Sequence, residues 1–299
     1  MRKKSFNTVN FEGFISQFMQ PDGDASFQFQ AAALQIYPLT MASTFIQPPT
    51  PLFRTQYNFL LLFRKGGGTQ QVDNEIIALQ ANDVLFIREG HLNSIQSIDP
   101  DTEGYFIYID NALLPQIFVE ETSLNRFSFH PKSTVTMADM DWLCQCCQLI
   151  LQQKTEDVYA AEIQSTLLKA MILKISKASS WGLPQLDRPT EITMKFKELL
   201  YENFIKEREI AFYSNALAVT ENYLNRCVKN VTNKPPKQHI NEMVIYYSKV
   251  LLMDRAKTIS EIAFALNFSD PSYFGRLFKQ ITEQTPTQYR QSFMQDLSE

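Results

Sequence analysis

Two pairs of basic residues at matching spacing are the part of the sequence most able to do chemistry. Arg226 and Lys229 lie three residues apart, and Arg276 and Lys279 repeat the pair fifty residues later. Residues three apart on a helix share a face, so each pair presents two cations to one partner. An arginine there can bond the edge of a guanine, whereas a lysine more often meets a phosphate. The alternative for each pair is an ordinary solvated surface.

The two pairs belong to a longer internal repeat. The segment YLNRCVKNVTNKPPKQ (223–238) aligns with YFGRLFKQITEQTPTQ (273–288), with six identities over 16 positions. Most of the other positions that carry apolar residues in one copy carry them in the other. A duplicated supersecondary unit explains this better than chance.

The second copy carries the signals of two short helices joined by a tight turn. Thr258 and Glu261 form a capping box that begins a helix through Leu266. Asn267 tolerates a left-handed conformation, and Asp270 then caps a second helix. In that helix one apolar stripe faces the preceding helix: Tyr273, Phe274, Leu277, Phe278 and Ile281. The sequence therefore predicts a helix-turn-helix motif with a polar and basic outer face.

The first copy has the same pattern, with Thr220 as the cap and a second helix over 221–231. Tyr223 is expected in its core. An exposed glycine at 275 is consistent with another surface approaching closely, and Arg290 is expected to meet DNA backbone or an acidic neighbour. The residues predicted to bind DNA are Thr220, Glu221, Asn222, Asn225, Arg226, Lys229, Ser269, Ser272, Gly275, Arg276, Lys279 and Arg290.

Between the copies, KQHINEMVIYYSKVLLMD (237–254) has the composition of one helix of 18 residues. At 1.5 Å per residue it is about 27 Å long. Such a rod can hold two recognition helices near one duplex turn apart, about 34 Å, so that both reach successive major grooves.

The charge of the chain is distributed unevenly. The net charge is −4. Residues 1–183 carry 13 Lys and Arg against 18 Asp and Glu, whereas residues 222–290 carry 10 against 5. A basic segment on an acidic protein is expected if only one end meets a polyanion such as DNA.

The elements before the repeat indicate a second domain. Residues 28–110 hold short apolar or alternating runs separated by turn material, which predicts an antiparallel barrel or sandwich. Helical spacing follows Pro131, and WGLPQLDRPT (181–190) is the best linker. We therefore expect a two-domain chain: an all-β domain (1–135), appended helices (136–180), the linker, and an all-α domain of two helix-turn-helix motifs joined by a long helix (191–299).

The segment from about 211 to 292 resembles the DNA-binding domain of AraC/XylS-family transcription regulators. The family signature is matched along EIAFALNFSDPSYFGRLFKQITEQTPTQYR. The family commonly has Gly where this chain has Asn233, Asn267 and Glu283, and Glu283 suits a left-handed turn least well. It often has Arg and Ala where this chain has Val244 and Ser248, so any contact made by that Arg is absent.

The front domain resembles the cupin-like sensor barrel of the same family, through GGGTQ and ANDVLFIREGHLNSI. The resemblance implies a small-molecule effector in the barrel, a homodimer formed through helices 138–178, double-stranded DNA half-sites as target, and activation through RNA polymerase. The residues expected to bind the effector are Arg54, Tyr57, Arg88, His91 and Tyr105. A regulator of the same family whose barrel only dimerises is the alternative.

Other classes of function find little support. Only three histidines are present and none forms an H-x-H pair, so a cupin-type enzyme is a remote alternative, and we expect no catalytic residue, metal or cofactor. Cys144, Cys146 and Cys147 splay apart on a helix and are expected to pack rather than ligate. No apolar run reaches the ~18 residues of a membrane span, and no secretory signal is apparent. We expect a reduced, cytoplasmic protein.

Overall fold

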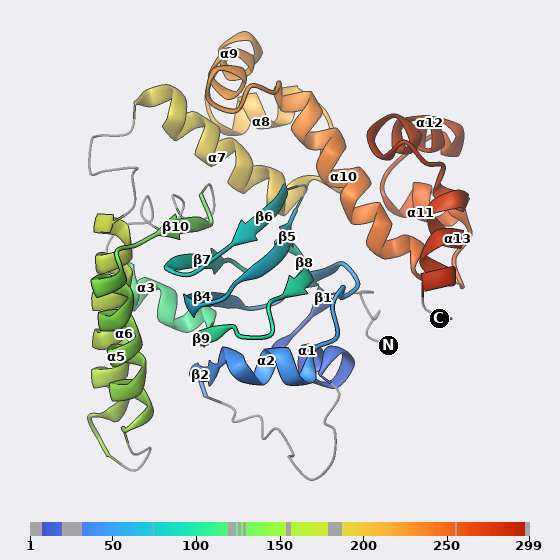
Figure 1. The fold of residues 1–299 in the computed structure, drawn as a ribbon. Coiled ribbons are helices and arrows are strands. Elements are labelled where there is room, and N and C mark those ends of the chain that lie inside the picture. Colours follow the sequence, from blue (N-terminus) through green and yellow to red (C-terminus); the bar gives the residue numbers. More distant parts are fainter. Residues whose placement is uncertain are drawn as a thin grey trace. The chain divides into compact units, whose positions relative to one another are not determined.

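The computed structural model describes residues 8–19, 32–73, 75–118, 124, 127, 130–153, 157–178, 187–254 and 256–296 (Figure 1). Two compact units make up the chain: one spans Val9–Gln185, and the other spans Leu186–Glu299 together with Met1–Thr8. The first unit is rich in β-strands and the second is helical, which confirms the predicted two-domain architecture.

The first unit contains two five-stranded sheets, and every pairing with a defined register is antiparallel. One sheet has the order β1-β3-β8-β5-β6, with strands Thr8–Val9, Phe53–Thr55, Leu92–Ile98, Gly68–Val72 and Glu75–Leu79. The other has the order β10-β7-β4-β9-β2, with strands Lys132–Thr134, Asp83–Ile87, Asn58–Lys65, Glu103–Ile109 and Leu34–Pro38. Side chains from both sheets share one apolar cluster, so the sheets enclose a common interior.

Strand β4 shows why this interior forms. Its residues Phe59, Leu61 and Phe63 belong to the interior cluster, while Leu60 and Leu62 belong to a second cluster on the other face. Successive side chains on a strand point to opposite faces, so this apolar run is buried on both sides. The glycines at 66–68 connect β4 of one sheet to β5 of the other, so this turn is not a hairpin; a Cβ at Gly67 would lie 2.0 Å from the Leu79 carbonyl oxygen.

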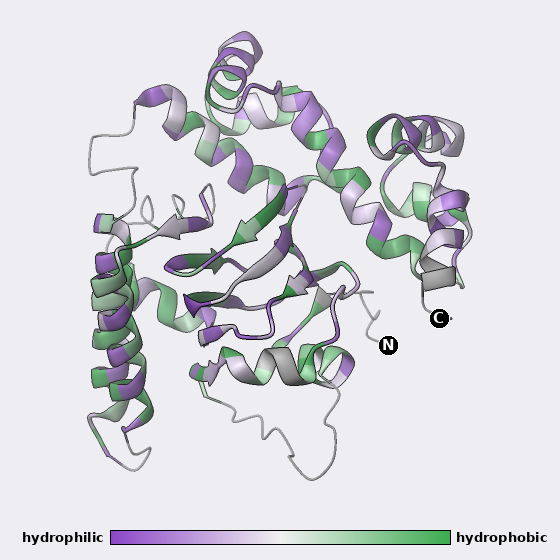
Figure 2. Ribbon diagram, in the orientation of Figure 1, coloured by the Kyte–Doolittle hydropathy of each residue, from purple (hydrophilic) through white to green (hydrophobic). Residues whose placement is uncertain are grey.

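Helices cover the outer face of β4. They are α5 (Met137–Leu151), α6 (Ala160–Ala178) and the short α3 (Leu114–Ile117), and their apolar residues share the second cluster with Leu60 and Leu62. Figure 2 shows hydrophobic and hydrophilic residues alternating along α5 and α6. Cys144, Cys146 and Cys147 are buried in this cluster with free thiols, as packing predicts, and burial raises the pKa of Cys144 to about 11.

The prediction of strands throughout 28–110 was wrong at one place. Helix α2 (Leu39–Phe45) follows β2 there. A further helix, α1 (Phe11–Phe18), was not predicted, and Asn10 caps it by accepting from the Gly13 N–H. Both helices contribute apolar side chains to the interior cluster.

The helical unit contains α7 (Arg188–Asn203), α8 (Ile210–Ala216), α9 (Glu221–Thr232), α10 (Pro236–Leu252), α11 (Ile259–Ala265), α12 (Pro271–Thr282) and α13 (Pro286–Asp296). The linker prediction ran too far, because Asp187 caps α7 and helix begins at Arg188; residues 181–186 lie outside the described residues. The connecting helix α10 has 17 residues, close to the expected 18, and Val244 and Ser248 are fully buried in it.

Candidate nucleic-acid interface and effector cavity

Each repeat forms a helix-turn-helix motif, α8–α9 and α11–α12. The Thr220 hydroxyl accepts from the Tyr223 N–H at 3.2 Å and so caps α9. The Asp270 carboxylate accepts from the N–H groups of Ser272 and Tyr273 at 2.8 and 3.2 Å and caps α12. The Ser272 N–H is the main cause that holds the pKa of Asp270 below its usual value. Both caps are as the sequence predicts.

The turns of both motifs use residues other than glycine in the left-handed region. Ala218 and Asn267 have φ of 53° and 59°, and a backbone bond spanning five residues closes each turn, Val219 N to Ser214 O and Phe268 N to Ala263 O. The second helices end alike, at Asn233 with φ 59° and Glu283 with φ 65°. Glu283 therefore takes the conformation that its residue type suits least.

The predicted DNA-binding side chains gather on the outer faces of α9 and α12. On the inner faces, Leu224, Cys227 and Val228 of α9 are buried, as are Phe274, Leu277 and Phe278 of α12. The outer side chains that are exposed are Thr220, Glu221, Asn222, Arg226, Lys229, Ser269, Ser272, Arg276 and Lys279. Each repeat thus presents its own polar and basic patch.

Two polar residues on these faces, Asn225 and Arg276, have partners within the chain. The half-buried Asn225 donates from Nδ2 to the Glu221 carbonyl at 3.0 Å. The Arg276 Nη2 lies 3.8 Å from the Asp270 Oδ2, and both side chains are more than half exposed. Such an exposed ion pair is weak, about 0–1 kcal/mol, so the guanidinium is available to another partner.

No packing contact within the chain requires a glycine at position 275. A Cβ built at this position would meet no heavy atom within 4 Å. Glycine inside a helix costs about 1 kcal/mol relative to alanine. The structure therefore offers no intramolecular reason for this cost, which fits the expectation that another surface approaches here.

The two tyrosines expected in the cores lie at their edges. Tyr273 is 42% exposed, which corrects the prediction, because Phe268 from the turn packs on Phe274 at 5.1 Å and leaves Tyr273 outside. Tyr223 is half-buried, with the Arg226 guanidinium 5.1 Å from its ring centroid.

Arg290 also differs from its prediction. Its Nε donates to the Leu252 carbonyl at 3.0 Å, the last residue of α10, and its Nη2 is buried without a hydrogen-bond partner in the described part of the chain. A cation at a helix C-terminus is favourable. The structure therefore places Arg290 between α13 and α10 rather than beside an acidic neighbour.

A contact missed from the sequence joins the two motifs. The Arg208 guanidinium, from the loop before α8, lies 3.7 Å from the ring centroid of Phe268 in the second turn. Asn267 donates from Nδ2 to the Lys206 carbonyl at 3.0 Å in the same region. Burial lowers the pKa of Arg208. No local pattern signals this contact, because its partners are about sixty residues apart.

A cavity lies in the interior of the first unit. The space open to the centre of a water molecule is about 80 Å³. Its walls come from both sheets and from α1 and α2, and aromatic rings including Phe11, Phe59 and Phe106 contribute to them. Tyr57, one of the five predicted effector residues, lines it and is 3% exposed.

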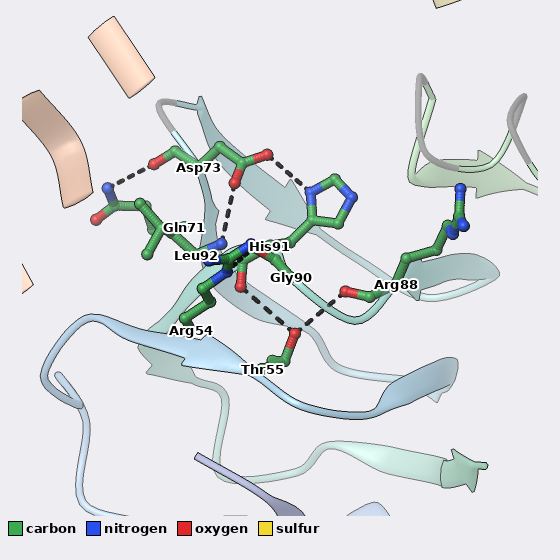
Figure 3. Close-up of polar contacts among 8 residues, drawn as sticks. All are labelled: Arg54, Thr55, Gln71, Asp73, Arg88, Gly90, His91 and Leu92. Atoms are coloured by element: carbon green, nitrogen blue, oxygen red, sulfur yellow. Dashed lines mark hydrogen bonds and ion pairs between the residues drawn. The ribbon is translucent and has the colours of Figure 1, made fainter. Parts of the chain in front are cut away.

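The other four predicted effector residues do not line this cavity. Arg54 and Arg88 belong to a polar network at the turn that connects β7 of one sheet to β8 of the other (Figure 3), in which Arg54 Nε donates to the Gly90 carbonyl at 2.9 Å. Thr55 donates to the Arg88 carbonyl at 3.1 Å. Tyr105 packs on the helix-covered cluster, because it falls on the opposite face of β9 from Phe106.

His91, also predicted to bind the effector, is buried away from the cavity. It is 4% exposed, and its Nδ1 lies 2.8 Å from the Asp73 Oδ2 (Figure 3). The other Asp73 oxygen accepts from the Leu92 N–H at 3.0 Å. The pair fixes the end of β5 against the start of β8.

Comparison with known proteins gives matches to both units. A model for a helix-turn-helix domain matches residues 213–292, and a model for an AraC-like ligand binding domain matches residues 54–171. The HTH-type transcriptional activator RhaR of Mannheimia succiniciproducens is 22% identical over 262 residues, 86% of this chain and 93% of that protein. The HTH-type transcriptional activator RhaS of Enterobacter sp. is 19% identical, over 85% and 92%.

Solved structures include ToxT from Vibrio cholerae O395, which is 15% identical, covers 86% of this chain and 97% of that chain, and has a TM-score of 0.42. The paired helix-turn-helix motifs and the barrel define a two-domain transcription regulator. From the two domain matches, the chain belongs to the AraC family of such regulators. No helix among the described residues is long and apolar enough to cross a membrane.

Proposed function

We propose that the protein is a sequence-specific transcription activator that binds paired half-sites through α9 and α12. The observation that carries the proposal is the repeated outer face, with Arg226 and Lys229 in one motif and Arg276 and Lys279 in the other, all exposed. The arginines read base edges and the lysines bind phosphates. The RhaR and RhaS relatives, both transcriptional activators, support activation, which would require a contact with RNA polymerase.

The test begins with selection of bound fragments from sheared genomic DNA of the source. Affinity for a recovered site is then compared between wild type, Arg226→Ala and Arg276→Ala. Each loss is expected to be about 5–150-fold, from ~1–3 kcal/mol per base contact. Arg188→Ala is the matched control, since Arg188 is exposed on α7 of the same unit. Equal effects of all three variants, or uniform recovery of DNA, contradict the proposal.

Regulation by a small molecule is the second part of the proposal. The ligand-binding domain match and the interior cavity support an effector site in the barrel. Binding there shifts the affinity for DNA only if the effector distinguishes two states of the protein. A regulator without an effector remains the alternative, and a compound that both stabilises the protein and changes its affinity for DNA rules that alternative out.

A homodimer completes the proposal, with α5 and α6 as its interface. These helices expose Leu149, Leu151, Ile163 and Leu173, each by 38% or more. Exposed apolar side chains on neighbouring helices are typical of an interface. The protein is proposed to act by binding rather than by catalysis.

A further inference from the structure

The cavity in the barrel selects for a particular chemistry of ligand. We propose that it takes a small, neutral and mainly apolar ring compound, and not a carbohydrate or a carboxylate. This inference rests on the proposed function only for its regulatory consequence. The chemistry of the site is argued from the cavity walls alone.

The residues that line the cavity all lie in the described part of the chain, and none of them carries a charge. A carboxylate or ammonium brought into such a site loses its hydration and gains no counterion, which is strongly unfavourable. The most polar part of the cavity wall is formed by the side chains of Gln70 and Asn93, which are 5% and 2% exposed. Gln70 donates to Asn93, so the two amides already satisfy each other in part.

The other polar side chains of the wall are Tyr37, Tyr57, Thr69, Ser97 and Thr102, and two of these are already bonded within the chain. Thr102 is bonded to the N–H and the carbonyl of Gly67 at 3.1 and 3.0 Å, and Tyr37 donates to Gln35 at 2.5 Å. A monosaccharide has four or five hydroxyls, and each one buried without a partner weakens binding. Aromatic rings instead offer faces and edges on which another ring packs favourably.

Three hydroxyls of the wall, on Tyr57, Thr69 and Ser97, make no hydrogen bond with the described residues, and Tyr57 is the buried one among them. Tyr57 is 3% exposed. Burial raises the pKa of Tyr57, so the hydroxyl stays neutral. A cavity of about 80 Å³ is several times the ~10–15 Å³ that one water needs, so it has room for a small ring. We therefore assign to Tyr57 the single hydrogen bond that orients the ligand.

The test uses calorimetry on the full-length protein with matched probes. Benzyl alcohol and benzoate have the same ring and differ in charge, while toluene lacks the polar group; D-glucose, L-rhamnose and L-arabinose represent sugars. We expect benzyl alcohol to bind at least tenfold more tightly than benzoate at pH 7.5, and no heat from the sugars. Tighter binding of benzoate or of any sugar, or no binding of the neutral rings, overturns the assignment.

Two variants locate the binding. Ile95→Phe fills the cavity and is expected to abolish binding, whereas Ile76→Phe makes the same change at a side chain that is 69% exposed in the same sheet. If Ile95→Phe does not fold, Tyr57→Phe still tests whether the ligand binds in the cavity, because this variant keeps the aromatic ring and removes only the hydroxyl. The preference for benzyl alcohol over toluene should then fall at least threefold. An unchanged preference refutes the role of Tyr57.

The affinity for a selected DNA site, measured with and without benzyl alcohol, separates the two proposals. If neutral rings bind and DNA affinity does not change, the assignment of ligand chemistry holds and regulation through the barrel fails. If a sugar binds and changes DNA affinity, regulation holds and the assignment fails.

Discussion

Gly275 offers a test in which stability and DNA binding should change in opposite directions. Replacing it by alanine adds a methyl group at a helical position where no heavy atom lies within 4 Å. Alanine is favoured over glycine in a helix by about 0.5–1 kcal/mol. For a unit of about this size, such a gain raises Tm by about 2–8 °C. If DNA backbone lies against this face, however, the methyl group occupies the space that the duplex needs.

The assay pairs thermal denaturation with fluorescence anisotropy on a selected DNA site. Gly275→Ala is expected to raise Tm and to weaken binding by about tenfold, which corresponds to ~1.4 kcal/mol. Asn230→Ala, at an exposed position of α9 outside the predicted DNA-binding set, is the control for changes in helix propensity alone. A higher Tm with unchanged affinity shows that DNA does not approach Gly275. A lower Tm shows that the position is not open, and refutes the structural reasoning.

Two further predictions concern the stability of the helical unit. Glu283→Gly should stabilise it by about 1 kcal/mol, because Glu283 has φ 65° and glycine bears no strain there; urea denaturation measures this, and a destabilised variant contradicts it. His239 has its pKa lowered to about 4, chiefly by burial, and its Nε2 lies 2.8 Å from the Thr232 hydroxyl. The unfolded chain, with a histidine pKa near 6.5, therefore binds the extra proton between about pH 6.5 and 4, so stability falls as pH falls through that window, by up to about 3 kcal/mol. Between pH 7 and 4, the free energy of unfolding of His239→Gln should fall by about 3 kcal/mol less than that of the wild type. If the two proteins lose stability in parallel as pH falls, the lowered pKa assigned to His239 is refuted.

The helix-turn-helix motifs could be predicted because their signals are local. Thr258 with Glu261, Asp270 and Asn267 each act within a few residues, and the capping box, the cap and the left-handed turn all form as expected. The apolar stripe at helical spacing then determines which face packs. Tyr273 escaped the prediction because its burial depends on Phe268, which the turn places ahead of it.

The cavity of the first unit was far less predictable because the strands around it are buried on both faces. Along β4 every residue from Asn58 to Phe63 is buried, so no polar alternation distinguishes the interior side from the helix-covered side. Tyr57 and Tyr105 were both predicted to bind the effector, and only Tyr57 lines the cavity. The position of His91 could not be predicted because it depends on Asp73, eighteen residues earlier. Only the pairing of β5 with β8 brings these two side chains into contact.

The two repeats are not interchangeable, and their difference bears on how the recognition helices are held. Helices α8 and α11 begin 49 residues apart, whereas the caps Thr220 and Asp270 are 50 apart, so the second turn is one residue longer. That longer turn carries Phe268, which is 2% exposed and lies under the Arg208 guanidinium from the loop before α8. A cation on an aromatic face contributes about 0.5–2 kcal/mol and requires a defined approach. The relative orientation of α9 and α12 is therefore fixed by two connections, the rod of α10 and this contact, and a bend in α10 alone cannot change it without also separating Arg208 from Phe268.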